Sequence, residues 1–262
     1  MSVTYKLGFT IIETMLFLAV TGVLIVGILA GTGTSVNIQR YRDSVSTLKS
    51  VLQDQYSQVT TVNNEIPADP IVCNNAASVS VGGSQSRGQS DCVVMGRYIA
   101  IDGSDIYTHT VIGHPPVPEV AYTTDINELS SYALSVLPSS TATSLMEWNS
   151  QITWPISGGG AKPAGTRRTI SLLILRSPTS GLVYTFSSNL NNNSPVELNN
   201  MVQAAAPETA LVDPYGGQTQ RRICVDSKGG FGGGMSVLIG AYASSANSIQ
   251  VRSNDMDASS QC

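Results

Sequence analysis

The chain has 262 residues, a formal net charge of -4, 12% charged residues, 24 Gly and 12 Pro. A chain so weakly charged and slightly acidic is not a general polyanion binder, and its many small and polar residues are typical of an exported surface protein. An even number of cysteines, four, favours two disulfides in an oxidising compartment.

An apolar run begins almost at the N-terminus and contains one ionisable side chain. Glu13 is the only such residue between Phe9 and Gly31. As a helix, residues 9–30 rise about 1.5 Å each and reach about 33 Å, against about 30 Å of hydrocarbon in a bilayer. A charged side chain at membrane depth costs about 2.5–3.5 kcal/mol on insertion scales. Glu13 is therefore a candidate functional residue in a predicted transmembrane helix.

A cleaved signal peptide is the alternative interpretation of this run. Its apolar region would span about 7–15 residues behind a basic leader. Here the run is longer, contains Glu13 and follows a leader whose only base is Lys6. The transmembrane helix is favoured, while its orientation stays open, because Arg40, Arg42 and Lys49 follow the run on its other side.

The N-terminus resembles the type IV pilin and type II secretion pseudopilin family at Lys6-Leu7-Gly8-Phe9-Thr10-Ile11-Ile12-Glu13. Precursors of that family have a short leader with a base, a Gly, and then Phe-Thr-x-x-Glu opening an apolar helix. The resemblance implies that a prepilin peptidase cuts between Gly8 and Phe9 and methylates the new terminus. It divides the chain into a leader at 1–8, a transmembrane and amphipathic helix at 9–62, and an extracytoplasmic head at 63–262.

Cleavage at this point would create a positive amine on Phe9, four residues before Glu13. Residues four apart share one face of a helix. In an apolar medium both charges are expensive unless they are paired, so Glu13 is expected to neutralise the Phe9 amine of its own chain or of a neighbour. In the family, pairing with the neighbour sets the stagger between subunits. The alternative is a protonated Glu13 without a partner.

An amphipathic stripe follows the apolar run. Its members recur at steps of three and four residues: Ile38, Tyr41, Val45, Leu48, Leu52, Tyr56 and Val59. The spacing predicts that one helix continues to about Val62 and packs on a sheet, with a coiled-coil partner as the less favoured alternative. Asn63, Asn64 and Pro67 supply stop signals. Gly27-x-x-x-Gly31 permits close approach of another helix.

The first part of the head is predicted to be loop-rich. Residues 63–92 resemble a surface loop closed by Cys73 and Cys92. Strands are expected at 93–101 and 106–112, joined by a hairpin turn at 102–105. A short helix is expected at 127–136, a strand at 146–154 and a glycine hinge at 158–160.

The last third of the chain predicts an antiparallel sheet. Its expected strands are short and apolar: 169–175, 182–187, 221–226, 235–243 and 248–252. A helix is expected at 196–205. Four cysteines allow three connectivities, of which the pairs closest in sequence, Cys73–Cys92 and Cys224–Cys262, are favoured. The fold class is thus α+β and pilin-like, a long N-terminal helix packed on a C-terminal antiparallel sheet.

No catalytic constellation, metal site or cofactor motif is found. His109 and His114 are attributed to an exposed hairpin, and the cysteines lack the short spacings of a zinc site. The glycine-rich stretch 229–234 lacks the Lys-Ser/Thr of a phosphate-binding loop. The pairs Arg167-Arg168 and Arg221-Arg222, with Tyr184 or Tyr242 nearby, make nucleic acid a less favoured partner.

These observations predict a structural filament subunit and not an enzyme, with a minor pilin or pseudopilin favoured. The partners that the resemblance implies are other pilin subunits, prepilin peptidase, an assembly platform with its ATPase, and membrane lipid before assembly. The precursor would be a single-pass membrane protein, and the product a surface filament. The alternative is a membrane-anchored adhesin or ligand-binding module with the helix as a tether. Adhesion, motility, secretion and DNA uptake are not separated by the sequence.

Overall fold

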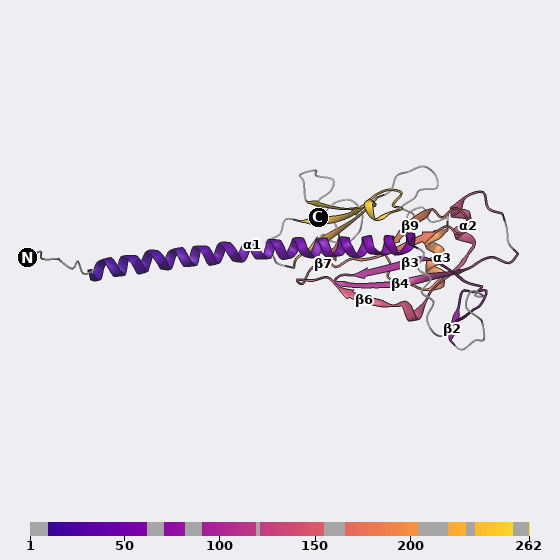
Figure 1. Cartoon of the computed structure of the whole chain (residues 1–262), viewed down its shortest axis with the longest axis horizontal. Helices are drawn as coiled ribbons and strands as arrows, with labels where there is room; N and C mark the ends of the chain where they lie inside the picture. The colour runs from indigo at the N-terminus through magenta and orange to yellow at the C-terminus, as the bar shows by residue number, and fades with distance from the viewer. Residues whose placement is uncertain are drawn as a thin grey trace, which may run out of the picture.

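A single long helix dominates the computed structural model, which describes residues 10–61, 71–81, 91–118, 121–154, 166–203, 220–228, 234–253 and 262. Helix α1, Ile11–Thr60, leaves an α+β head and projects far beyond it (Figure 1). It has 50 residues and hence a length of about 75 Å. The expected helix is confirmed over this range, whereas its predicted first and last residues, Phe9 and Val62, lie outside the described residues.

Two antiparallel sheets form most of the described part of the head, beside a small two-stranded sheet. The larger has the order β5-β4-β3-β8-β9, with β6 also paired to β4, and the smaller has the order β12-β11-β10-β7. The strands of the larger sheet are β3 (Val93–Asp102), β4 (Asp105–His114), β5 (Ala133–Val136), β6 (Ala142–Leu145), β8 (Thr169–Arg176) and β9 (Val183–Ser188). Those of the smaller sheet are β7 (Gln151–Thr153), β10 (Arg221–Asp226), β11 (Met235–Ile239) and β12 (Ile249–Ser253).

The sequence predicts that all strands of the last third of the chain form one sheet, and this is wrong. Strands β8 and β9 join β3 and β4, while β10 to β12 form the second sheet with β7. The reason lies in β8, which is apolar on both faces. Its Leu172 and Ile174 belong to one core and its Leu173 and Leu175 to another. Such a strand requires cover on both sides and therefore takes a central position.

Strand β7 joins the two sheets. It pairs with β10, and its Ile152 N–H donates to the Gly103 carbonyl at 2.8 Å, in the β3–β4 turn. The Arg168 N–H in turn donates to the Ile152 carbonyl at 3.1 Å. The backbone hydrogen-bonding network therefore continues from one sheet to the other at the end of the head where α1 enters.

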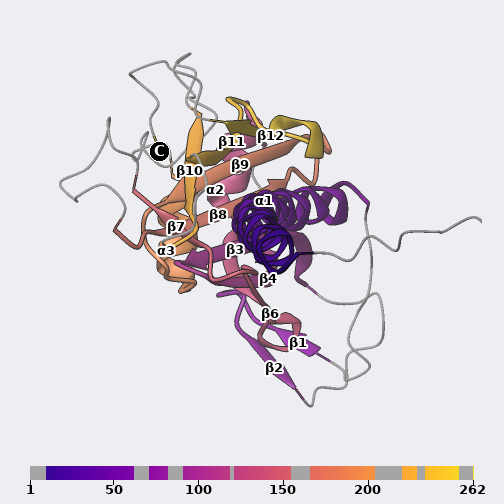
Figure 2. The same cartoon turned by 90° about the vertical axis from the view of Figure 1, so that its left-hand side faces the viewer.

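The second half of α1 lies between the sheets, as Figure 2 shows in a view along the helix. The predicted stripe is confirmed, because its members from residue 41 onward are buried: Tyr41, Val45, Leu48, Leu52, Tyr56 and Val59. They form one core with apolar side chains from both sheets. The Tyr41 hydroxyl donates to the Val225 carbonyl and accepts from the Met235 N–H, both at 2.7 Å. The Tyr56 hydroxyl is 2.7 Å from that of Thr185.

Two short helices cover the opposite face of the larger sheet. They are α2 (Asp125–Ser131) and α3 (Pro195–Val202), which begin at Thr124 and Ser194 as N-caps. Leu129 and Leu198 pack there against Tyr98 and Phe186 of the sheet. The head thus has a smaller sheet, a helix, a larger sheet and a second helical layer, in that order.

The segment expected to be a loop at 63–92 contains a two-stranded antiparallel pair, β1 (Ile71–Cys73) and β2 (Val79–Val81). Asn74 builds its turn, because the side-chain oxygen accepts from the N–H groups of Ala76 and Ser78. A disulfide joins Cys73 to Cys92, with Cα atoms 5.9 Å apart, and Cys224 pairs with Cys262 at 5.3 Å. These are the pairs that the sequence favours.

Three further expectations require correction. The helix expected at 127–136 is α2 followed by β5, because Val136 pairs with Val111 of β4. Of the strand expected at 146–154 only β7, Gln151–Thr153, is present, because Trp148 and Asn149, with φ angles of 58° and 57°, turn the chain before it. The strand expected at 235–243 ends at Ile239. The glycine hinge at 158–160 lies outside the described residues.

Candidate functional site: the projecting helix and its junction with the head

The first turn of α1 is built by Thr10 and Glu13. Thr10 is the N-cap, and its Oγ1 accepts from the Glu13 N–H at 3.3 Å. The spacing Thr-x-x-Glu is that of a capping box, and a carboxylate in the first turn also suits the positive end of the helix dipole. Gly8 and Phe9, the predicted processing residues, lie outside the described residues.

The surface of the projecting half is apolar all round. Its most hydrophobic 18-residue window has a mean hydropathy of 2.4, and none of that window is buried within the chain. Ile11, Ile12 and Val23 are each more than 70% exposed. The helix is long and apolar enough to cross a membrane. An apolar surface of this extent requires cover by lipid or by other chains.

The threonine hydroxyls on this half are satisfied within the helix itself. Each threonine hydroxyl donates to a carbonyl three or four residues earlier: Thr14 to Ile11, Thr21 to Phe17, Thr32 to Leu29 and Thr34 to Ala30. Such bonds remove the cost of taking a hydroxyl into an apolar medium. By contrast, no described side chain pairs with the Glu13 carboxylate.

No described residue outside α1 packs against the glycines of this half. A Cβ atom added at Gly22, Gly27, Gly31 or Gly33 would meet no atom within 4 Å. None of them is required for a turn, since all lie inside the continuous helix. Glycine in a helix interior costs about 1 kcal/mol relative to alanine. Close approach of another helix is a role that offsets such a cost.

Arg97 of β3 fixes the packed half of α1 on the larger sheet. Its guanidinium donates to the side-chain oxygens of Gln55 and Gln58 on the helix and to the Thr110 hydroxyl on β4. Burial lowers the pKa of Arg97, and the nearby Asp54 carboxylate opposes that shift. The two glutamines lie on one helix face, so these contacts set the rotation of α1 about its axis.

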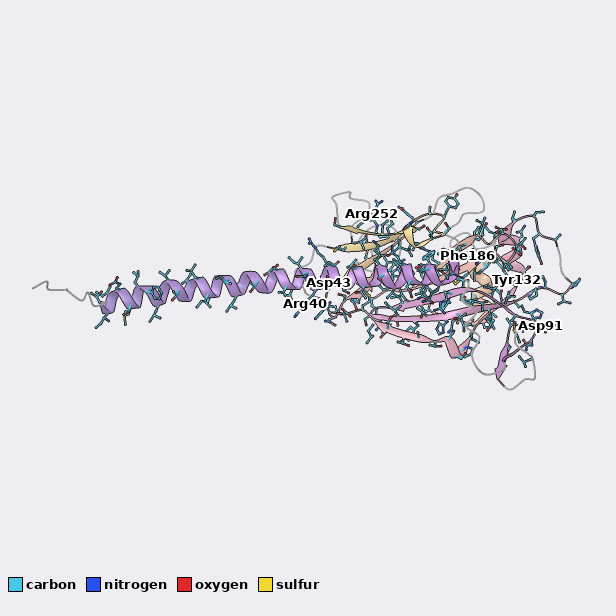
Figure 3. The ribbon with its side chains drawn as sticks, viewed as in Figure 1. Arg40, Asp43, Asp91, Tyr132, Phe186 and Arg252 are labelled. Carbon is cyan, nitrogen blue, oxygen red and sulfur yellow. A yellow bond between two sulfur atoms is a disulfide. The ribbon has the colours of Figure 1, made fainter. Side chains whose placement is uncertain are left out.

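Aromatic contact marks the point where α1 leaves the head. The Arg40 guanidinium lies over the Trp148 ring, 4.7 Å from its centroid. Figure 3 labels Arg40 and Asp43 at this junction. The sequence gives no signal for the pair, because Trp148 belongs to a turn far along the chain from Arg40.

Both histidines are buried, which corrects the expectation of an exposed hairpin. His109 Nδ1 is 3.1 Å from the Thr141 hydroxyl, and burial, followed by the charge of Arg97, lowers the pKa of His109. His114 Nδ1 donates to the Pro115 carbonyl at 2.6 Å. Their hydrogen bonds serve the fold.

The predicted basic pairs are largely engaged within the head. Arg167 forms ion pairs with Asp102 at 2.8 Å and Asp105 at 3.5 Å. Arg168 is buried, lies over the Trp154 ring and donates to the Arg222 carbonyl and to Asn189. Tyr184 is not brought to these arginines, since it pairs with Leu175 at the other end of the larger sheet.

A hollow of about 430 Å³ lies beside α2. Its walls include Pro115, Tyr122, Asp125, Glu128, Tyr132 and Thr179. The buried Glu128 carboxylate accepts from the hydroxyls of Ser177 and Thr179. Hydrogen bonds from the hydroxyls of Ser180 and Tyr184 lower the pKa of Asp125. Burial, together with the hydrogen bond to Asp125, raises the pKa of Tyr184 to about 12. Tyr132 is labelled at the end of the head opposite to the projecting helix (Figure 3).

Within the described ranges, no group of three or more His, Cys, Asp or Glu side chains is placed to hold a metal ion. Sequence reasoning missed Arg97, Trp148, Asp125 and Glu128, whose partners come from distant parts of the chain. Comparisons with protein-family models, with curated proteins and with solved structures found no match to this chain.

Proposed function

We propose that this chain is a structural subunit of a type IV pilus-like filament, of the minor pilin or pseudopilin kind. The observation that carries the proposal is the Gly8-Phe9-Thr10-Ile11-Ile12-Glu13 motif at the start of a helix whose first half is apolar and uncovered. The α+β head with its two disulfides supports it as an exported domain.

The precursor is stored in the membrane by the projecting half of α1. After cleavage behind Gly8, this half leaves the lipid and packs against the same half of neighbouring subunits. The threonine hydroxyls already donate to backbone carbonyls of α1, and the glycines leave room for another helix to approach. Both features suit lipid as well as a helical filament core. The head faces outward.

Glu13 supplies the charge that orders assembly in this proposal. Its carboxylate has no described partner within the chain, and the Phe9 amine created by cleavage is the complementary charge. In an apolar core an unpaired charge is costly, so a subunit is accepted only where the two charges meet. Prepilin peptidase, an assembly platform with its ATPase and the other subunits are the proposed partners.

Processing is tested by intact mass and N-terminal sequencing of membrane-extracted protein from cells with and without prepilin peptidase. A methylated Phe9 start that depends on the peptidase is expected. Gly8→Leu is expected to block cleavage, and Leu7→Ala serves as the matched control that leaves it intact. An intact Met1 in peptidase-containing cells, or a start near Gly31, contradicts the proposal.

Assembly is tested by variants that separate the charge of Glu13 from its place in the capping box. Glu13→Gln keeps a residue that suits this position and removes the charge, whereas Thr10→Ala removes the cap and keeps the charge. Loss of filament incorporation is expected for Glu13→Gln and not for Thr10→Ala. The reverse order would show that Glu13 acts only in starting the helix.

The hollow beside α2 favours a second candidate, a membrane-anchored adhesin or ligand-binding module. Its volume lies in the range of small-molecule sites, about 300–1,000 Å³. In that case α1 is only a tether, and Glu13→Gln leaves surface display and binding unchanged. Binding that survives Glu13→Gln but not Glu128→Gln would favour this candidate over the filament subunit.

A further inference from the structure

A small surface at the base of the head presents an aromatic and a cationic side chain together. We call it the basal patch and define it by Arg40 of α1 and Trp148 of the β6–β7 turn. Trp148 is 51% exposed. The Arg40 guanidinium covers one face of the indole. Figure 3 labels Arg40 where α1 leaves the head, so the patch lies on the side of the head from which the helix projects.

The backbone of this turn is held in an unfavourable conformation. Trp148 and Asn149 have φ angles of 58° and 57°, in the left-handed region. For a bulky residue such as tryptophan this costs about 1–2 kcal/mol. About half of the Trp148 surface nevertheless stays accessible, at 51%. The turn holds a large aromatic ring outward at the base of the head.

We propose that the basal patch lies in the headgroup layer of the membrane that α1 crosses and fixes the direction in which the stored subunit tilts. This inference rests on the proposed membrane storage of the precursor and does not depend on filament assembly. Tryptophan is enriched at membrane interfaces, where an amphipathic ring lies at the level of the headgroups. Interfacial Trp and Arg side chains are the anchors that set helix tilt.

Distances along α1 permit this contact. Arg40 follows Ala30, the last residue of the apolar run, by about 15 Å of helix. The headgroup layer extends about 5–7 Å beyond the hydrocarbon. Transmembrane helices tilt by about 20° on average and up to about 40°, which lowers the side of the head toward which the helix leans. Helical side chains also lean toward the N-terminus, so Arg40 extends toward the bilayer. A tilt toward Trp148 near the upper end of this range, about 40°, therefore brings the patch to the headgroups, whereas the average tilt of about 20° leaves it above them.

Charge around the patch is mixed. Two basic residues of α1, Arg40 and Arg42, and two acidic residues, Asp43 of α1 and Glu147 next to Trp148 in sequence, lie in this part of the chain. Within the described part of the chain, Arg40 forms no ion pair. Because the opposite charges nearly balance, the indole is expected to dominate the contact. Zwitterionic phosphatidylcholine should therefore suffice, without anionic lipid.

The chain holds two tryptophans, Trp148 and Trp154, which allows a direct test. Full-length Trp154→Phe, whose emission comes from Trp148 alone, is reconstituted in phosphatidylcholine vesicles with and without a lipid quencher near the top of the acyl chains. Trp148→Phe, which retains the partly buried Trp154 under Arg168, is the matched control. The lipid quencher is expected to reduce Trp148 emission at least twofold and to leave Trp154 emission unchanged.

Trp148 emission that responds to aqueous iodide and not to the lipid quencher would overturn the inference. Quenching that disappears when the protein-to-lipid ratio is lowered would also overturn the inference. Such a dependence would mean that the patch contacts a second copy of the chain. Flotation with the vesicles after an alkaline wash tests membrane insertion separately, so failure of storage is distinguishable from failure of the patch. If Trp154→Phe does not fold, the difference between the unmodified chain and Trp148→Phe gives the same contrast.

Discussion

The two halves of α1 share one continuous backbone and meet opposite environments. The first half is apolar on every side and is not buried by any described part of the chain, whereas the second is apolar along one stripe and lies between two sheets. A helix that is apolar on all sides is buried on all sides, in a membrane or a protein core. A helix with one apolar stripe buries only that face. Hydrophobic pattern, more than helix propensity, thus assigns the two halves to assembly and to folding.

Truncation gives the largest test of this comparison. A fragment beginning at Thr34 is expected to fold as a soluble head, since it retains all the buried α1 residues. A fragment beginning at Thr61 is expected not to fold, because it leaves the inner faces of both sheets open. Circular dichroism and mapping of both disulfides distinguish the two. A folded Thr61 fragment would show that α1 is only attached to the head.

Leucine truncation compares the halves at matched chemistry. Leu52 is fully buried and Leu24 is 58% exposed. Leu52→Ala is expected to destabilise the head by about 2–5 kcal/mol, through lost burial and a cavity. Leu24→Ala is expected to leave the stability of the head within about 0.5 kcal/mol. Urea denaturation in detergent measures both changes. Equal losses in the free energy of unfolding would contradict the assignment of the second half of α1 to folding and the first half to assembly.

The hydroxyl of Tyr41 offers a smaller perturbation at the boundary between the halves. Tyr41→Phe removes two hydrogen bonds, to the Val225 carbonyl of β10 and from the Met235 N–H of β11. The variant leaves that carbonyl and that N–H without the hydroxyl as their partner. A loss of about 1–3 kcal/mol is expected. Tyr242→Phe, at an exposed turn, is the control and should cost little. Equal denaturation midpoints for the two variants would show that the two hydrogen bonds of Tyr41 do not stabilise the head.

Alkaline pH should weaken the packing of the second half of α1 in the head. Burial raises the pKa of Tyr41 and of Tyr56 above the ordinary value of 10.0. The folded chain therefore holds protons that the unfolded chain releases, so this stability is present below pH 10 and falls as the pH rises above it. Thermal melts of the Thr34 fragment across pH 8–11 measure the slope. Tyr56→Phe should make it shallower, and an unchanged slope would assign the effect to other groups.

Local pattern predicted much of the fold. The stripe from Tyr41 to Val59 predicted the packed helix, and the apolar runs of β3, β4 and β8 predicted strands, because these signals need only neighbours in sequence. The division into two sheets was not predictable, since strand pairing joins residues far apart. The burial of His109 likewise depends on Thr141, which belongs to another segment.

The candidate site divides in the same way. Glu13 stands out from its own surroundings, as the one charge in an apolar run. Trp148 does not, because its significance comes from a left-handed turn and from Arg40, neither of which leaves a local signal. The helix expected at 127–136 failed at Leu134 and Val136, where the alternation of a strand is only four residues long and pairing with β4 decides the outcome.

The position of α1 between the sheets also has a mechanical consequence. Strands β3 and β4 lie along the helix, so a pull on its projecting end acts parallel to the contacts that hold it (Figure 1). The bonds of Tyr41, of Arg97 with Gln55, and of Tyr56 are spread along the packed length. An axial load must therefore shear them together and cannot peel them apart one at a time. The head is built to transmit tension from the helix into both sheets at once.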